Sequence, residues 1–230
     1  MSNNAGRALV TGTSSGIGLA IAQHLLDGGW QVVGFDIAPA ALQHPCFEAR
    51  KVDLCDGTAT ESAIAALGPV QAFVHAAGVL RVEPLGALKP ADGQLMWQLH
   101  VDALSRLANT VLPAMRDARQ GRVVLIGSRV ARGVAGRSQY AATKAAIVAL
   151  ARSWAAEVIA AGVTVNVVSP AATRTAMLDD PARQGTPPRL PPLGRLIEPA
   201  EIAALVAYLL SPAAAPITGQ DIQVCGGSSL

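Results

Sequence analysis

The chain has 230 residues, of which 51% are hydrophobic, 15% are charged and 3% are aromatic, and its formal net charge is +2. This length favours one α/β domain over two small ones, and the small net charge with scattered arginines argues against a nucleic-acid partner. No apolar run approaches the roughly 18 residues that a membrane span needs, so we expect no membrane partner either.

Apolar runs alternate with segments of helical spacing along the whole chain. In chain order, strands are expected at residues 7–12, 30–36, 47–56, 69–79, 122–128, 163–170 and 221–227. Helices are expected at residues 16–29, 58–67 with a threonine cap, 92–121, about 136–161 and 199–211. This alternation predicts right-handed βαβ units. The predicted fold is a single doubly wound Rossmann-type domain over residues 1–230, with a parallel seven-stranded sheet and helices on both faces.

The turn "TGTSSGIG" (residues 11–18) joins the first expected strand to the first expected helix. Its glycines permit a tight turn and a close approach of the backbone, and the helix N-terminus beyond it suits a pyrophosphate. Asp36 ends the second strand, where a carboxylate can bind ribose hydroxyls and repel a 2′-phosphate. We therefore predict a nicotinamide dinucleotide site that prefers NAD over NADP.

Tyr140 and Lys144 lie four residues apart on an expected helix and can reach one pocket. A free phenol has a pKa of about 10, and a nearby ammonium lowers it toward the range of a usable acid–base at neutral pH. Ser128, which follows the fifth strand, can hydrogen-bond the same substrate oxygen. This group favours hydride transfer coupled to proton transfer at an alcohol or ketone.

Four segments together resemble motifs of the short-chain dehydrogenase/reductase family, and the resemblance covers nearly the whole chain. "TGTSSGIG" is similar to the cofactor motif of that family, "HAAG" (75–78) to its Asn-Asn-Ala-Gly motif and "YAATK" (140–144) to its active-site motif. "NVVSP" (166–170) is similar to the strand before its nicotinamide loop. The resemblance implies that Tyr140 is the acid–base, that Lys144 lowers its pKa and binds the nicotinamide ribose, and that Ser128 orients the substrate.

The same resemblance implies the remaining cofactor contacts and the assembly. Asp53 is expected at the adenine, and Thr175 at the carboxamide or the pyrophosphate. The expected cofactor-binding residues are Gly12, Ser14, Ser15, Gly16, Ile17, Gly18, Asp36, Ile37, Asp53, Leu54, Ala76, Ala77, Gly78, Tyr140, Lys144, Pro170, Thr173 and Thr175. A homotetramer or homodimer is expected, formed through the two long helices and the last strand.

The sequence departs from the family pattern at several positions. The family usually has a catalytic asparagine in a Val-Asn pair of the long helix, and we match that pair to Val101-Asp102. Asp102 is thus expected at the catalytic site, where its carboxylate would disfavour the phenolate, or else only as the cap of a helix kink. Ser128 precedes Tyr140 by one residue fewer than usual, and His75 is expected to pack in the core.

The three cysteines (Cys46, Cys55 and Cys225) have no metal-like spacing, so we expect no metal site. Their odd number favours a reduced, cytoplasmic setting. No basic residue adjoins Cys225 in the sequence, so we interpret it as a structural thiol.

Residues 174–198 are rich in proline, arginine and glycine and are expected to form a substrate lid. A weaker resemblance points to the 2,3-dihydro-2,3-dihydroxybenzoate dehydrogenases, and hence to a cyclic secondary alcohol or dihydrodiol as substrate. Four arginines are available for a substrate carboxylate: Arg81, Arg129, Arg132 and Arg137.

Two other functions remain open. One is a 3-oxoacyl carrier-protein reductase, which would prefer NADPH, a preference that Asp36 opposes. The other is a sensor that binds NAD without chemistry, which Asp102 and the shortened spacing after Ser128 favour.

Overall fold

The computed structural model describes residues 6–178 and 189–230. Seven strands form one fully parallel sheet in the order β3-β2-β1-β4-β5-β6-β7. This confirms the predicted fold class. The strands are β1 (Arg7–Thr11), β2 (Gln31–Asp36), β3 (Phe47–Lys51), β4 (Ala72–His75), β5 (Gly121–Ile126), β6 (Val163–Pro170) and β7 (Asp221–Val224).

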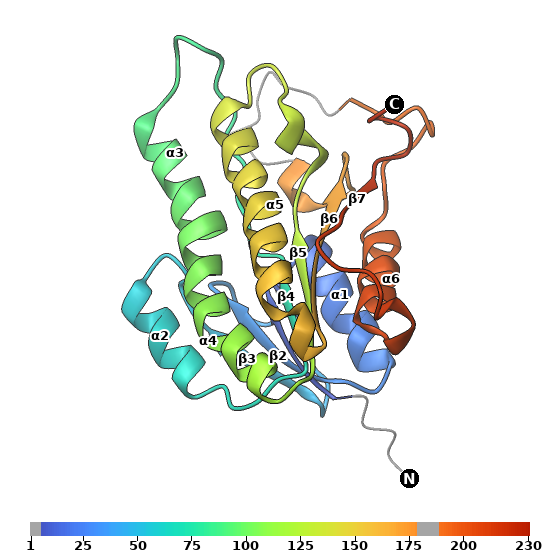
Figure 1. The fold of residues 1–230 in the computed structure, drawn as a ribbon. Helices are drawn as coiled ribbons and strands as arrows, with labels where there is room; N and C mark the ends of the chain where they lie inside the picture. The colour runs from blue at the N-terminus through green and yellow to red at the C-terminus, as the bar shows by residue number, and fades with distance from the viewer. Residues whose placement is uncertain (1–5, 179–188) are drawn as a thin grey trace.

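Helices cover both faces of the sheet (Figure 1). One face carries α1 (Gly16–Asp27) and α6 (Pro199–Leu210), and the other carries α2 (Gly57–Ala65), α4 (Ala103–Asp117) and α5 (Ser138–Val158). The shorter α3 (Pro90–Trp97) precedes α4. Successive side chains of a strand point to opposite faces, so the adjacent residues Leu9 and Val10 of β1 lie in two different apolar cores. The nearly continuous apolar strands of the sequence reflect this double coverage.

The order in which strands are added to the sheet reverses between β1 and β4. The chain moves outward from β1 to β2 and β3, and then returns to place β4 on the other side of β1. In the registered pairing, Thr11 at the end of β1 lies beside both Phe35 of β2 and His75 of β4. The carboxyl ends of these strands therefore meet at one edge of the sheet, where doubly wound folds bind their ligands.

The long helix expected at residues 92–121 is interrupted. Between α3 and α4 the chain forms a π-helical turn, Gln98–Asp102, in which the backbone hydrogen bonds span five residues rather than four. The segments on both sides of this turn are helical, so the sequence pattern predicts one helix. The turn changes which side chains of this segment point toward the sheet.

Two helix starts show how local side chains set element boundaries. The sequence predicts a threonine cap for α2, but the cap is Asp56, whose carboxylate accepts a hydrogen bond of 3.0 Å from the Ala59 N–H. At α6, Glu198 and Glu201 form a reciprocal capping box, and Pro199 occupies the first turn as expected.

The two ends of the expected lid are paired with each other by backbone contacts. Thr173 pairs with Ile197 as an isolated parallel bridge. The Arg174 N–H donates to the Ile197 carbonyl at 2.9 Å, and the Ile197 N–H donates to the Ala172 carbonyl at 3.0 Å. A short 3₁₀ turn follows at Ala176–Leu178. Residues 179–188 of the expected lid, like residues 1–5, lie outside the described residues. Across residues 6–178 and 189–230, no helix is both long and apolar enough to cross a membrane.

Candidate active site

A cavity of about 780 Å³ opens at the carboxyl edge of the sheet. It is lined by residues that follow β1 through β6 and by the first turns of α5. The structure brings all of the predicted catalytic and cofactor-binding residues to this cavity except Ser14 and Asp102. Those that line it are Gly12, Ser15, Gly16, Ile17, Gly18, Asp36, Ile37, Asp53, Leu54, Ala76, Ala77, Gly78, Ser128, Tyr140, Lys144, Pro170, Thr173 and Thr175.

The glycine turn is held against the end of β4. The Thr11 hydroxyl accepts hydrogen bonds of 3.0 Å from the N–H groups of both Ala76 and Ala77. Gly12 has φ +74°, and a Cβ there would lie 2.9 Å from the Ala77 backbone. A Cβ on Gly18 would lie only 2.1 Å from the Gly12 carbonyl oxygen. The turn is thus too compact for side chains at these glycines, and this compactness brings the α1 N-terminus to the cavity.

The first turn of α1 is suited to an anion. Its cap, Ser15, makes no side-chain hydrogen bond to the helix, so the first N–H groups keep their capacity to bind a ligand. Backbone N–H groups at a helix N-terminus, together with the helix dipole, favour phosphate groups. This part of the site therefore fits the pyrophosphate of a dinucleotide.

Two carboxylates stand at the ends of β2 and β3. The Asp36 carboxylate accepts hydrogen bonds from the N–H groups of Ser14 at 2.8 Å and Ala38 at 2.9 Å. Ser14 thus serves the site indirectly, by fixing Asp36 rather than by lining the cavity. Asp53 accepts from the Cys55 N–H at 2.9 Å. Among the described residues, the ends of β1, β2 and β3 contribute no lysine or arginine to the cavity lining.

Tyr140, Lys144 and Ser128 are all buried, with exposed fractions of 9%, 4% and 8%. Lys144 Nζ lies 5.8 Å from the centre of the Tyr140 ring and donates a hydrogen bond of 2.8 Å to the Ile126 carbonyl. Burial lowers the pKa of Lys144 to about 7. The Ser128 hydroxyl accepts from the Val130 N–H at 3.2 Å, which turns the chain after β5 into a 3₁₀ helix at Arg129–Arg132.

His100 is a residue of this site that the sequence analysis missed. It lies in the π-helical turn, is fully buried, and stacks edge-on against Tyr140 with ring centres 5.7 Å apart. Its Nε2 accepts a hydrogen bond of 3.0 Å from the Val79 N–H, and its Nδ1 lies 2.9 Å from the Thr143 hydroxyl. Burial, and then the charge of Lys144, lower its pKa well below the usual value. A histidine within the apolar run "LMWQLHV" was the available signal.

Asp102 does not reach the cavity, although the sequence analysis expected it at the catalytic site. Its side chain is half-buried and is absent from the lining, whereas His100 of the same turn contacts Tyr140. Residues two positions apart in a helix do not share a face, so an inward-facing His100 excludes an inward-facing Asp102. The alternative expectation was that Asp102 caps a helix kink. The π-helical turn that Asp102 ends is such a kink, but the Asp102 side chain makes no capping hydrogen bond to α4.

His75 is buried as expected, but it also joins the hydrogen bonds around Thr11. Its Nδ1 lies 3.1 Å from the Thr11 hydroxyl. Burial lowers the pKa of His75 to about 3, and the charge of Lys144 acts in the same direction. At Cys225, hydrogen bonding by Ser229 lowers the pKa of the thiol, which the sequence alone did not indicate.

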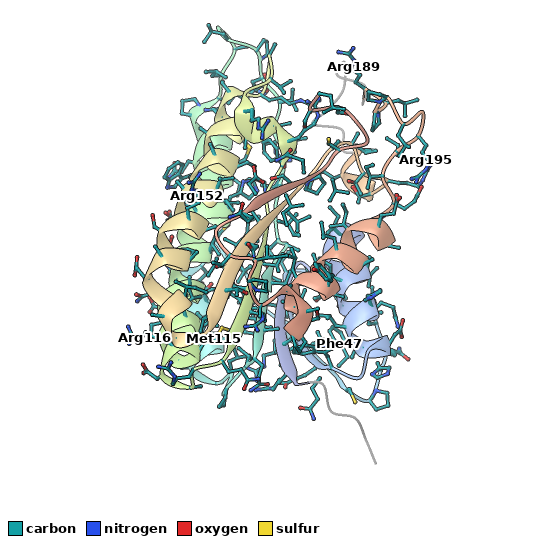
Figure 2. All side chains as sticks on the ribbon, turned by 45° about the vertical axis from the view of Figure 1, so that its right-hand side comes forward. Phe47, Met115, Arg116, Arg152, Arg189 and Arg195 are labelled. Carbon is teal, nitrogen blue, oxygen red and sulfur yellow. The ribbon has the colours of Figure 1, made fainter. Side chains whose placement is uncertain are left out.

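Three of the four arginines predicted for a substrate carboxylate line the cavity, and one does not. Arg81, Arg129 and Arg137 line it, as does Arg189, whereas Arg132 is exposed and does not. Arg81 lies 3.8 Å from the Asp92 carboxylate, and Arg129 donates to the Ser228 carbonyl at 3.4 Å. Figure 2 shows Arg189 at the upper end of the molecule, far from Phe47 and Met115 at the lower end.

Known proteins are similar to this chain along almost its entire length. A family model described as enoyl-(acyl carrier protein) reductase matches residues 12–229. The 3-oxoacyl-(acyl-carrier-protein) reductase FabG of Vibrio cholerae is 36% identical, with 96% of each chain covered. The 2,3-dihydro-2,3-dihydroxybenzoate dehydrogenase of Escherichia coli is 35% identical, again with 96% of each covered.

Solved structures are also similar to this chain along its full length. A short chain dehydrogenase/reductase family protein superimposes with a TM-score of 0.91 at 33% identity, covering 100% of this chain and 99% of the other. An actinorhodin polyketide ketoreductase solved with NADPH gives a TM-score of 0.87 at 28% identity, covering 100% and 98%. With the sheet order, the glycine turn and these matches taken together, the chain belongs to the short-chain dehydrogenase/reductase family of nicotinamide-dependent oxidoreductases.

Proposed function

We propose that this protein is an NAD-dependent oxidoreductase that interconverts a secondary, cyclic alcohol or dihydrodiol and the corresponding ketone. The observation that carries the proposal is the composition of one cavity. Tyr140, Lys144 and Ser128 line its catalytic part, and the fixed Asp36 carboxylate stands where β2 ends. The 35% identity to a dihydrodiol dehydrogenase supports the cyclic substrate.

In this proposal, Tyr140 moves the proton of the reacting hydroxyl group. A charged amine beside a phenol favours its ionised form, and Lys144 Nζ lies 5.8 Å from the Tyr140 ring. With its pKa lowered to about 7, Lys144 is charged in a large fraction of molecules at neutral pH. Ser128 holds the substrate oxygen near the phenol. A nicotinamide ring bound in the cavity would accept or supply the hydride.

The preference for NAD rests on Asp36. Two backbone N–H groups hold its carboxylate at the cavity wall, where a second carboxylate, Asp53, follows the next strand. A fixed carboxylate can accept hydrogen bonds from the ribose hydroxyls and repels a 2′-phosphate. Within the described lining, the neighbouring strand ends supply no cation that would offset this repulsion.

A 3-oxoacyl carrier-protein reductase is the second candidate function. The 36% identity to a relative with that name favours it, as does the likeness to a ketoreductase solved with NADPH. It predicts NADPH as the better cofactor and a thioester substrate. By family resemblance we further propose a cytoplasmic homotetramer or homodimer.

The test is reduced-nicotinamide absorbance measured with NAD and NADP separately, over cyclic secondary alcohols, dihydrodiols and a 3-oxoacyl thioester. We expect turnover with NAD and a cyclic alcohol, its loss in Tyr140→Phe, and its retention in the exposed control His24→Gln. Turnover only with NADPH and the thioester would establish the second candidate instead. Cofactor binding by calorimetry without turnover of any compound would favour the sensor.

A further inference from the structure

A chain of hydrogen bonds runs through His100 from the segment after β4 to the first turn of α5. The Val79 N–H donates to His100 Nε2, so this nitrogen is the acceptor of the ring. In a neutral imidazole the proton then lies on Nδ1. Nδ1–H donates to the Thr143 hydroxyl, and the Thr143 hydroxyl donates to the Tyr140 carbonyl at 2.9 Å. Each donor in this chain meets an acceptor, so its direction is fixed.

The three segments that these hydrogen bonds connect are distant in the sequence and meet only in the folded protein. Val79 follows β4, His100 lies in the π-helical turn, and Thr143 lies in α5 between Tyr140 and Lys144. His100 and Thr143 are 0% and 2% exposed, so bulk water does not compete for their bonds. Because a buried polar group that loses its partner is costly, the arrangement resists local rearrangement.

The same histidine also contacts the reacting side chain. Its ring meets the Tyr140 ring edge-on, with ring centres 5.7 Å apart and planes at 79°. On its other sides, Tyr140 packs in a small apolar cluster with Leu80, Met96 and Val130. His100 thus holds Tyr140 in two ways, through the ring contact and through the backbone of its helical turn.

We propose that His100 is a positioning residue, which fixes the phenol of Tyr140 beside Lys144 by tying the first turn of α5 to the Val79 backbone. The inference rests on the proposed role of Tyr140 as the acid–base. His100 acts on the reaction only through Thr143 and Tyr140, and it moves no proton itself.

The charges around His100 agree with this role. Lys144 of α5 and His75 of β4 both disfavour a proton on His100, in addition to burial. Protonation would turn Nε2 into a donor, which would face the Val79 N–H donor without an acceptor between them. The neutral ring required by the hydrogen bonds is therefore the form that the surroundings stabilise.

Two substitutions at His100 each keep one of its two hydrogen bonds, to Val79 or to Thr143, and remove the other. In His100→Asn the side-chain amide takes the place of Nδ1 and keeps a donor near Thr143, whereas in His100→Gln it takes the place of Nε2 and keeps an acceptor near Val79. We expect kcat to fall in both, and further in His100→Gln, by about 10- to 100-fold, because small misplacements of a reacting group cost about that much. Cofactor affinity, measured by calorimetry, is expected to change by less than about threefold, because His100 is not in the cavity lining.

Thr143 provides the matched pair of variants. Thr143→Val keeps the shape and removes the hydroxyl, and it should lower kcat as His100→Gln does, with the pH of half-maximal kcat/KM displaced upward. Thr143→Ser restores the hydroxyl and should restore both the rate and the pH profile. A merely structural role would lower the melting temperature and leave the pH profile of the folded enzyme in place, and that result would overturn the proposal.

Tyr140→Phe separates failure of this inference from failure of the proposed function. If Tyr140→Phe is inactive while the His100 and Thr143 variants keep kcat within about twofold of wild type, the positioning role is wrong and the proposed function stands. If Tyr140→Phe keeps its activity, the proposed function is wrong, and the positioning role falls with it.

Discussion

The two halves of the cavity are built by different means. At the ends of β1, β2 and β3, backbone groups form most of the cavity wall. They are the glycine turn, the α1 N-terminus, and the N–H groups of Ser14 and Ala38 that hold Asp36. In the half at the ends of β4, β5 and β6, buried side chains make the hydrogen bonds. His100 bonds the Thr143 side chain, and Lys144 bonds the Ile126 carbonyl. The first half depends on local chain geometry, and the second depends on tertiary contacts.

This difference determines what a substitution disturbs. In the backbone-built half, a new Cβ or a lost carboxylate changes how a dinucleotide binds. In the half built from buried side chains, a changed side chain leaves another buried polar group without its partner and displaces the reacting phenol. Four substitutions test the comparison, from the largest expected effect to the smallest.

Tyr140→Phe should have the largest effect. Removing a general acid–base lowers kcat by about 10²- to 10⁴-fold, whereas the apolar ring still packs against Leu80 and Met96. Steady-state kinetics with the substrate identified in the panel measure the loss, and calorimetry should show cofactor affinity within about threefold of wild type. A loss of cofactor binding as large as the loss of kcat would show that the two halves are not separable.

Asp36→Asn should change cofactor choice without changing the chemical step. A hydrogen bond to a charged group contributes about 1.5–3 kcal/mol, so the affinity for NAD should fall by about tenfold or more. NADP should bind no worse than before, because the repelled phosphate loses its opposing charge. The ratio of kcat/KM for the two cofactors is the measurement, and an unchanged ratio would contradict the assignment of Asp36.

Gly18→Ala should destabilise the backbone-built half directly. The added Cβ would lie 2.1 Å from the Gly12 carbonyl oxygen, so the turn must open. Overpacking of this kind costs about 1–3 kcal/mol of unfolding free energy, measurable by urea denaturation. Gly28→Ala is the control, because its nearest contact would be an ordinary 3.4 Å. Equal losses of unfolding free energy in Gly18→Ala and Gly28→Ala would contradict a turn too compact for a side chain at Gly18.

His75→Asn should have the smallest effect of the four at neutral pH, because its effect on stability should appear only in acid. Burial lowers the pKa of His75 to about 3 from 6.5, so between these values the unfolded chain binds a proton that the folded protein does not. The free energy of unfolding therefore rises with pH by up to about 1.4 kcal/mol per pH unit in this window, and the contribution is complete above it.

Asparagine at position 75 keeps an acceptor for the Thr11 hydroxyl but does not titrate. Urea unfolding at several pH values should show a shallower slope in this acid window than in wild type, while the exposed control His24→Asn keeps the wild-type slope. An identical slope in His75→Asn and wild type would mean that this histidine does not set acid stability.

The same contrast explains what could be predicted from the sequence. The order of elements follows from apolar periodicity, and Gly12, Gly18 and Asp36 occupy fixed places in a strand–turn–helix–strand segment. Tyr140 and Lys144 share one helical face. All of these relations are local, so a linear pattern carries them.

Two features that the sequence did not predict are the role of His100 and the cap of α2. The first depends on contacts between distant segments, and the second on which of several nearby polar residues caps the helix. The π-helical turn lies between two helical apolar patterns, so the long helix was predicted as continuous. Asp102 was expected at the catalytic site because Val101-Asp102 was matched to the Val-Asn pair of the family, whereas the residue beside Tyr140 is His100. The bonds from His100 to Val79 and Thr143 span 21 and 43 positions. The α2 cap is Asp56, where a threonine only a few residues along the chain was expected.

The anchored ends of residues 174–198 have a consequence for how far the length of this segment can change. The bridge between Thr173 and Ile197 fixes the distance that the intervening chain must span. For a loop with fixed ends, doubling the length costs only about 0.6 kcal/mol. Insertions and deletions between the two anchors should therefore leave the stability of the sheet almost unchanged, even though both ends of the segment reach the cavity, at Ala176, Met177 and Arg189.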